Sequence, residues 1–237
     1  MSDVLDSVSR QLALAEESDG GWTIAETRRD VILAHWPIAL EAVARQLPPD
    51  LPVDTFEGEA WLGVVACRLE ALRVRGLPPL PGLSSGPQLE VCTYVSVGER
   101  PGIWLFSLDR TKQVLVEAAK RSLRLPAYRA EITARPGRVE AVRDGLAFRA
   151  GYSSAGEPFV PRAGTLDYFL TERYSLYTAD GGRLYRAELK HRPWSVRRAR
   201  CTVEVATIAP VLLDGEPHAL CADRQDVLAW PLEELEQ

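Results

Sequence analysis

Lysine is scarce in this chain of 237 residues: only Lys112, Lys120 and Lys190 occur among its 28 basic residues. Since no two of them are adjacent, few positions are left for chemistry that depends on a lysine nucleophile with a second lysine beside it. Basic residues are also not in excess, because the formal net charge is -5 at pH 7. Dedicated nucleic-acid binders usually carry a basic excess, so we expect no nucleic-acid partner.

Long apolar runs and a secretory signal are missing as well. No run approaches the roughly 20 apolar residues that a bilayer-spanning helix needs. The N-terminus, MSDVLDSVSR, has an acid where a signal peptide would carry bases and an apolar core. These absences predict a cytoplasmic protein without a membrane partner.

Several signatures of metal and cofactor sites are absent. None of the four cysteines has a partner at C-x-x-C spacing, which argues against a zinc knuckle or a thioredoxin-type redox site. No H-x-H or H-E-x-x-H spacing joins the histidines. Glycine-rich phosphate loops and the G-x-S-x-G of serine hydrolases are not found either. We therefore expect neither a metal nor a cofactor.

What the chain does contain is a succession of short strand-like segments. They lie near 59–72, 89–97, 103–108, 128–135, 138–143, 145–152, 199–206 and 227–230. Helical patterns occur at 4–15, 38–47, 112–123 and 165–170. This pattern predicts an α+β, mainly antiparallel fold with two or three peripheral helices. We divide the chain into an N-terminal extension with a helical pattern, residues 1–21, and a single β-rich domain, residues 22–237.

The segment 170–194, LTERYSLYTADGGRLYRAELKHRPW, carries the densest set of polar and aromatic side chains. Two β-rich runs flank a D-G-G sequence at 180–182, which predicts a hairpin. On an extended strand the consecutive Glu172 and Arg173 would point to opposite faces. At most part of the set would then face one pocket.

Six side chains are candidates for contacts with a ligand. Arg173 is a natural anchor for a carboxylate, with Tyr174 and His191 nearby; a structural ion pair of Arg173 is an equal alternative. The remaining candidates are His35, Cys92 and Glu90, of which Cys92 and Glu90 share a strand face. For Cys92 the alternative is an inert buried thiol.

Acid–base catalysis has two candidates, Glu172 and His191. A histidine pKa near 6.5 suits proton transfer at neutral pH. The alternative for His191, and for His35, is an imidazole that hydrogen-bonds a backbone carbonyl at a strand end.

Six motifs follow one another in a defined order. They are H-W-P at 35–37, D-T-F-x-G-x-A-W at 54–61, P-G-x-W-x-F-S-L-D at 101–109, E-R-Y-x-L-Y at 172–177, H-x-P-W at 191–194 and R-Q-D-V-x-A-W-P at 224–231. In this order they resemble the YqjF-like family of uncharacterised bacterial proteins, over about residues 22–235. The resemblance implies an acetoacetate-decarboxylase-like fold, whose curved sheet closes into a cone or barrel around an interior pocket. It implies no established activity.

The chain departs from these relatives at two places. Decarboxylases of this fold form a Schiff base on one of two lysines that follow a proline, whereas the similar place here reads R-L-P-A-Y at 124–128. We therefore do not expect Schiff-base decarboxylation. YqjF-like proteins commonly read E-L-N-V-R where this chain has Q-L-E-V-C at 88–92. If this segment lines the pocket of the family, this protein either binds a different ligand or has lost an activity of the family.

Three hypotheses follow from the sequence. The first, which we favour, is a protein that binds a small carboxylate or aromatic molecule inside the sheet. The second is a lyase-like or isomerase-like enzyme that uses Glu172 and His191 without a Schiff base. The third is a structural or partner-binding protein whose interior is filled by its own side chains. The sequence does not indicate the oligomeric state.

Overall fold

The computed structural model describes residues 2–17 and 21–235, which form thirteen strands and four helices. The strands are β1 (Ile24–Ile38), β2 (Ala60–Val74), β3 (Gly86–Val97), β4 (Arg100–Arg110), β5 (Ala127–Arg129), β6 (Glu131–Arg135), β7 (Arg138–Arg143), β8 (Leu146–Phe159), β9 (Ser175–Asp180), β10 (Arg183–His191), β11 (Val196–Ala206), β12 (His218–Ala229) and β13 (Glu233–Glu234). The helices are α1 (Ser2–Glu16), α2 (Leu40–Ala44), α3 (Gln113–Leu123) and α4 (Leu166–Thr171). Helix α1 lies in the N-terminal extension, and the three helices of the domain agree with the two or three expected around the sheet.

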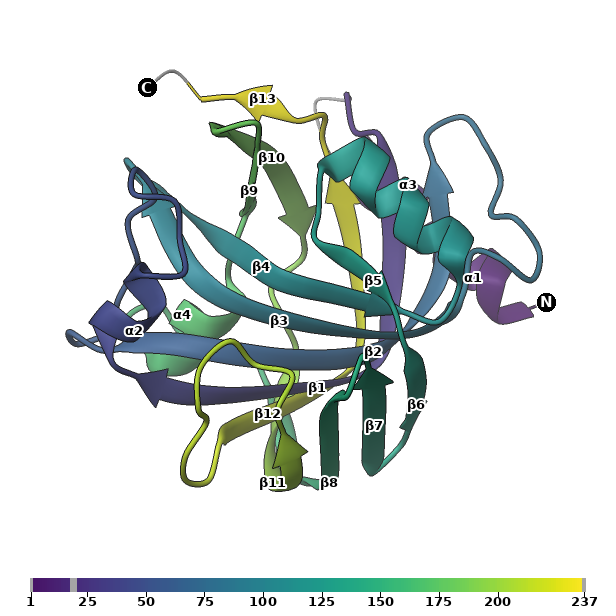
Figure 1. Ribbon diagram of the computed structural model, residues 1–237. Helices are drawn as coiled ribbons and strands as arrows, with labels where there is room; N and C mark the ends of the chain where they lie inside the picture. Colours follow the sequence, from purple (N-terminus) through teal and green to yellow (C-terminus); the bar gives the residue numbers. More distant parts are fainter. Residues whose placement is uncertain (1, 18–20, 236–237) are drawn as a thin grey trace.

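Seven strands pair so that the sheet returns on itself (Figure 1). Their order is β10-β9-β4-β3-β2-β1-β12, and β12 pairs again with β10 through residues 227–229 and 189–191. We call these seven strands the ring. Among the described strand pairs, only those of β4 with β9 and with β5 are parallel. The expectation of a curved, mainly antiparallel sheet is therefore confirmed.

Four of the remaining strands build a second layer outside the ring, while β5 pairs with β4 and β13 with β10. β11, β8, β7 and β6 continue in this order from β12. Val139 and Phe148 of this layer pack with Trp36, Leu62 and Val91 of the ring in one buried cluster. A separate buried cluster fills much of the interior of the ring. The strands β1 to β3 are thus covered on both faces, as in other two-layer domains.

Strand β1 changes the phase of its alternation at Asp30. Glu26 and Arg28 line an interior cavity, and beyond Asp30 the inward-facing residues become Val31 and Leu33. Asp30 has a positive φ of 51°, and the pairing with β2 shifts by one residue around it, which is the geometry of a β-bulge. Because the pattern has no single period of two, the sequence did not predict this strand.

The bounds of two later elements, α2 and β8, also differ from those that the sequence predicted. The helix expected at 38–47 is shorter, because β1 runs to Ile38 and α2 covers only Leu40–Ala44. Pro37 lies within the strand and not at the start of a helix. Strand β8 is also longer than expected, ending at Phe159.

The predicted hairpin is confirmed. Strands β9 and β10 pair from Ser175–Glu188 to Asp180–Arg183. The two linking glycines, Gly181 and Gly182, have φ values of 58° and 79°. A type I′ turn requires positive φ at both central positions, which glycine adopts without steric cost.

Helix α1 is attached to the ring by buried polar bonds. Ser7 Oγ donates to Glu70 Oε2 over 2.8 Å, and Gln11 Nε2 donates to Thr27 Oγ1 over 3.1 Å. Gln11 Oε1 accepts from Arg73 Nε over 2.8 Å.

Among the described residues, no helix combines the length and the apolar character needed to cross a membrane.

Candidate functional site

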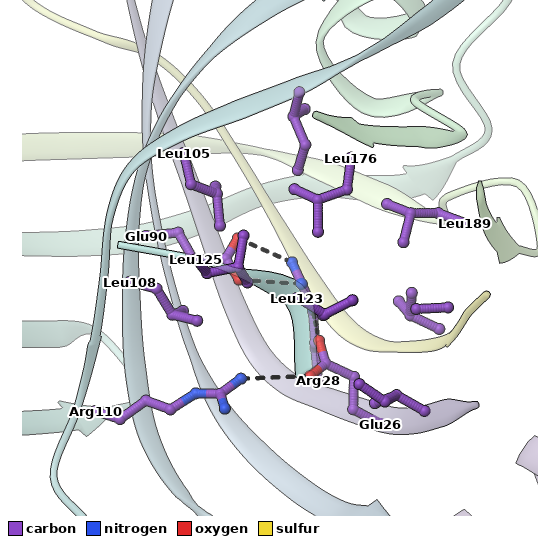
Figure 2. Close-up of a pocket in the computed structure, with 14 residues that line it drawn as sticks. Glu26, Arg28, Glu90, Leu105, Leu108, Arg110, Leu123, Leu125, Leu176 and Leu189 are labelled. Atoms are coloured by element: carbon purple, nitrogen blue, oxygen red, sulfur yellow. Dashed lines mark hydrogen bonds and ion pairs between the residues drawn. The ribbon is translucent and has the colours of Figure 1, made fainter. Parts of the chain in front are cut away.

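Four charged side chains meet inside the ring (Figure 2). Arg28 Nε donates to Glu26 Oε1 over 2.8 Å, and Arg28 Nη2 lies 3.0 Å from Glu90 Oε1. On the other side of Glu26, its Oε2 lies 3.7 Å from Arg110 Nη2. These residues come from β1, β3 and β4, and we call them the charged cluster. The other residues that line this space are all aliphatic, six of them leucines, so the charges lie in a largely apolar interior.

Gln88 completes the hydrogen bonding of the charged cluster. Its Nε2 donates to Glu90 Oε1 over 2.7 Å, and its Oε1 accepts from Arg110 Nε over 2.7 Å. Arg110 Nη1 also donates to the carbonyl oxygen of Leu115 over 3.3 Å. The two arginines and two glutamates are thus held in place from several directions.

A cavity of about 60 Å³ adjoins the charged cluster, and we call it the inner cavity. It is lined by Ile24, Glu26, Arg28, Glu90, Ile103, Leu105, Leu108, Arg110, Leu123, Leu125, Leu176, Leu189, Val227 and Ala229. A concave apolar space with a few convergent polar groups is the usual form of a small-molecule site.

The pKa values of the two carboxyl groups of the charged cluster are shifted in opposite directions. It raises the pKa of Glu90, and the neighbouring Glu26 carboxylate adds to this rise against the opposing effect of Arg28. Burial would also raise the pKa of Glu26, but Arg28 and Arg110 together hold it below the ordinary value. Glu90 is therefore the member of the cluster that takes up a proton most readily.

A larger opening, which we call the outer groove, lies between α3 and the loop that joins β2 to β3 (Figure 1). Its volume is about 510 Å³, and its lining residues are Ile24, Glu26, Leu72, Arg73, Val74, Leu77, Pro78, Leu80, Leu83, Ser84, Arg110, Val114, Leu115, Ala118, Ala119, Arg121, Ser122, Leu123 and Leu125. Five of these residues also line the inner cavity: Ile24, Glu26, Arg110, Leu123 and Leu125. The outer groove and the inner cavity therefore adjoin.

A second interior cavity of about 60 Å³ contains most of the ligand residues that the sequence predicted. Its wall includes Glu90, Cys92, Arg173 and His191, and we call it the His191 cavity. Arg28 and Glu90 line both this cavity and the inner cavity. The Arg28–Glu90 ion pair therefore bounds both spaces.

Arg173 is bound by the protein itself. Its Nη1 donates to Asp54 Oδ2 and its Nε to the carbonyl oxygen of Phe169, each over 2.5 Å. The guanidinium also lies 4.0 Å from the centre of the Phe169 ring and 5.0 Å from that of Tyr94. These contacts leave Arg173 less free for a ligand than the sequence suggested.

Glu172 and Arg173 are not strand residues, which corrects the expected alternation. They lie between α4 and β9, and both are buried. Glu172 Oε1 accepts from the backbone N–H of Trp194 over 2.9 Å, and Glu172 Oε2 accepts from the Tyr174 hydroxyl over 2.5 Å. The helix end at Thr171 redirects the chain, so the period-two rule does not apply here.

His191 lies between backbone groups and Gln225. Its Nδ1 is 2.9 Å from the carbonyl oxygen of Arg192 and 3.0 Å from Gln225 Nε2, and its Nε2 is 3.2 Å from the carbonyl oxygen of Arg173. The ring stacks on Tyr174 at 4.6 Å. Burial lowers the pKa of His191. Both ring nitrogens already have partners, and Glu172 does not line the His191 cavity.

His35 and Cys92 lie beside Gly63 in the interior. A Cβ atom at Gly63 would come within 2.9 Å of His35 and 3.0 Å of the Cys92 sulfur. Neither ring nitrogen of His35 makes a hydrogen bond of good geometry within the described chain. Burial lowers the pKa of His35 to about 3 and raises that of Cys92 to about 12. Both side chains are therefore neutral near pH 7.

Among the described residues, no three His, Cys, Asp or Glu side chains are grouped to hold a metal ion.

The three lysines all lie away from the two interior cavities. Lys112 Nζ donates to the carbonyl oxygens of Gly82 and Ser85, and Lys190 Nζ donates to that of Glu17. Lys120 is exposed on α3. Ala127 and Tyr128, which stand where the resemblance places the lysine pair of the decarboxylases, line neither interior cavity.

Sequence reasoning identified Glu90 but missed Glu26, Arg28 and Arg110. The bulge at Asp30 hid the strand that carries Glu26 and Arg28. Arg110 directly follows a recognised motif, yet nothing local shows that it turns inward at the end of β4. A charged residue within a strand pattern was the one available signal, and it does not distinguish a buried cluster from a solvated face.

Several solved structures share this fold. The enduracididine biosynthesis enzyme MppR complexed with pyruvate has a TM-score of 0.65 and 12% identity, and the match covers 93% of each chain. An acetoacetate decarboxylase-like enzyme from Sphingomonas wittichii RW1 has a TM-score of 0.64 and 15% identity, over 91% of this chain and 94% of that one. Acetoacetate decarboxylase from Legionella pneumophila has a TM-score of 0.66 and 9% identity, over 92% and 88%. At these identities the likeness concerns the fold alone.

Sequence comparison gives a nearer relationship. The uncharacterized protein YqjF of Bacillus subtilis (strain 168) is 35% identical over 230 residues, which cover 90% of this chain and 93% of that protein. Residues 25–226 match DUF2071, a family described as an uncharacterized conserved protein. This chain therefore belongs to the DUF2071 family and is YqjF-like, with an acetoacetate-decarboxylase-like fold.

Proposed function

We propose that this protein binds a small monocarboxylate in the inner cavity, with Arg28 as the anchor and without a Schiff base. The observation that carries the proposal is the position of the Arg28 guanidinium. It lies inside the ring at the wall of a cavity, beside a carboxyl group, Glu90, whose pKa is raised. An arginine in a water-poor interior is a strong and geometrically selective partner for a carboxylate.

The charge balance of the cluster favours an anion when Glu90 is protonated. With all four groups ionised, the charges of Arg28 and Arg110 cancel those of Glu26 and Glu90. Protonation of Glu90 leaves one net positive charge, and a bound carboxylate then restores neutrality. Since an unpaired charge is costly in an apolar interior, binding of the anion and proton uptake by Glu90 should be coupled.

Arg28 is a better anchor than Arg173, which was the candidate from the sequence. Both arginines have carboxylate partners, Asp54 for Arg173 and Glu26 and Glu90 for Arg28, but the raised pKa of Glu90 lets one partner of Arg28 become neutral. The Arg173 side chain is also only 5% exposed. The Arg28 side chain is 16% exposed and lines both interior cavities. Pyruvate is a suitable first probe, because a solved structure of the same fold is a complex with pyruvate.

The experiment measures pyruvate binding by isothermal titration calorimetry from pH 5 to pH 9. For the wild-type protein we expect the affinity to fall as pH rises through the raised pKa of Glu90, because ionised Glu90 repels the ligand. Glu90→Gln should remove this pH dependence and tighten binding at pH 8 by about tenfold or more, since a nearby like charge is removed. Borohydride treatment with pyruvate should leave the protein mass unchanged.

Glu172→Gln is the matched control, because it neutralises another buried carboxyl group that lines neither interior cavity. It should leave both the affinity and its pH dependence unaltered. Absence of pyruvate binding at every pH would refute the proposal. A change caused by Glu172→Gln and not by Glu90→Gln would contradict the assignment of the site to the inner cavity.

A further inference from the structure

The outer groove has unusually apolar walls for a feature at the surface. Leu77 and Leu80 of the loop between β2 and β3 are 61% and 58% exposed, and Val114 of α3 faces them across the groove with 47% exposure. Exposed apolar side chains gathered around one hollow commonly mark a binding site.

The loop that forms one wall is held in place by side-chain bonds. Ser84 Oγ accepts from the backbone N–H of Leu80 over 2.6 Å, and the carbonyl oxygen of Ser84 accepts from Leu72 N–H over 2.9 Å. Lys112, just before α3, donates to the carbonyl oxygens of Gly82 and Ser85. These bonds connect the loop to α3, so the groove is formed before any ligand enters, which lowers the entropy cost of binding.

The groove narrows to the charged cluster at its inner end. The residues shared with the inner cavity are apolar on one side, with Leu123 and Leu125, and charged on the other, with Glu26 and Arg110. A molecule that reaches from the surface to Arg28 would therefore pass from an apolar groove of about 510 Å³ into a cavity of about 60 Å³ whose charged wall is formed by Glu26, Arg28, Glu90 and Arg110. Such a gradient fits a molecule with a charged head and a long apolar tail.

We infer that the ligand is a medium-chain alkyl monocarboxylate, whose carboxylate meets Arg28 and whose alkyl tail occupies the outer groove. This inference rests on the proposed function and adds the class of ligand to it. The anionic head is fixed by charge complementarity at the cluster, and the tail is selected by the apolar walls. Each methylene moved from water into such a space strengthens binding by about fourfold.

The test is a chain-length series of n-alkanoates from acetate to decanoate, titrated below their micellar concentrations at pH 6. Affinity should rise by about fourfold per methylene until the groove is filled. Octylamine, which has the same tail with a cationic head, should not bind detectably, because the cluster offers no net negative charge to it.

Two tryptophan variants of α3 locate the tail. Ala118 is exposed and lines the groove, so Ala118→Trp should fill it and abolish the gain for chains longer than about four carbons. Lys120→Trp places the same side chain on the same helix outside the groove lining and should behave like the wild type. Acetate and pyruvate should bind all three proteins equally, because the inner cavity is unchanged.

The outcomes separate this inference from the proposed function. If short carboxylates bind but longer ones gain nothing, or if the gain survives Ala118→Trp, the inference is wrong and the proposed function stands. If no carboxylate of any length binds, both fail. A dimer that Ala118→Trp dissociates in sedimentation experiments, without any gain in affinity with chain length, would instead make the groove a contact between two copies.

Discussion

At the scale of single residues, the buried carboxyl groups of this protein differ in how well they are compensated. Glu172 accepts two hydrogen bonds and Glu26 contacts two arginines. Asp109 in β4 is fully buried, and among the described residues its carboxylate pairs only with Arg143, at 2.8 Å and in poor alignment for a hydrogen bond. Burial raises the pKa of Asp109 to about 6. Its ionisation therefore opposes folding near neutral pH.

Asp109→Asn should show this effect on stability. The folded-state pKa of Asp109 is raised from 3.8 to about 6, so its favourable contribution is complete below pH 4 and is lost as pH rises through 6. Relative to the variant, the wild type should lose about 1 to 3 kcal/mol of unfolding free energy between pH 4 and pH 8. The unfolding free energies of both proteins are measured by urea unfolding at several pH values.

Asp50→Asn provides the control for Asp109→Asn, because Asp50 is exposed. Its unfolding free energy should follow that of the wild type at every pH. Parallel curves for Asp109→Asn and the wild type would show that Arg143 compensates the carboxylate fully.

At the scale of elements, the bulge in β1 decides which charges face inward. Without the phase change at Asp30, either Glu26 and Arg28 or Val31 and Leu33 would lie on the outer side of the ring. A one-residue change of phase moves every later side chain to the opposite face. The bulge thus lets one strand supply both the charged cluster and the apolar interior.

Asp30→Val should destabilise the protein if the fold depends on this bulge. A β-branched residue adopts positive φ only with considerable strain, whereas aspartate tolerates it. Asp223→Val is a matched control, since both aspartates make surface ion pairs with arginines of β2 or β11, and such pairs contribute little. Asp30→Val should lose about 1 to 2 kcal/mol more than Asp223→Val in urea unfolding, and Asp30→Gly should not.

Equal losses for Asp30→Val and Asp223→Val would mean that the bulge relaxes at little cost. In that case the inward orientation of Arg28 would be maintained by the charged cluster itself and not by the strand geometry.

At the scale of the whole molecule, the site exists because the ring closes. Closure depends on two junctions, the β10–β12 pair and the short parallel pair between β4 and β9. At the second junction Gly102 lies so close to β9 that an added Cβ would meet the carbonyl oxygen of Ser175 at 2.4 Å and the Tyr177 ring at 2.7 Å. A backbone atom cannot yield as a flexible side chain does, so only glycine fits.

Gly102→Ala should therefore destabilise the protein by about 3 kcal/mol, the upper part of the usual range for overpacking. Gly151→Ala in β8 is the control, because its added Cβ would have only one neighbour, at 3.9 Å. Thermal and urea unfolding compare the two variants. Equal stability of both would mean that β4 and β9 separate without consequence for the ring.

The sequence was informative where structure depends on neighbours along the chain. The turn at Gly181 and Gly182 and the helices predicted at 112–123 and 165–170 are local features, and the structure has all three. The second helix is capped by Thr165, whose hydroxyl accepts from Tyr168 N–H. Strand β1 was missed because its bulge breaks the period of two. Glu172 and Arg173 were misplaced onto a strand because the end of α4 redirects the chain there.

The sequence by itself determined the family, the mainly antiparallel fold and the absence of a lysine pair, because ordered motifs, turn residues and composition are properties of the linear chain. Only the tertiary structure decided that Glu26 and Arg28 meet Glu90 and Arg110, and that Arg173 is already paired with Asp54. The physical reason is that contacts across a closed ring join positions more than 60 residues apart. Their energies depend on burial and distance, which no local pattern encodes.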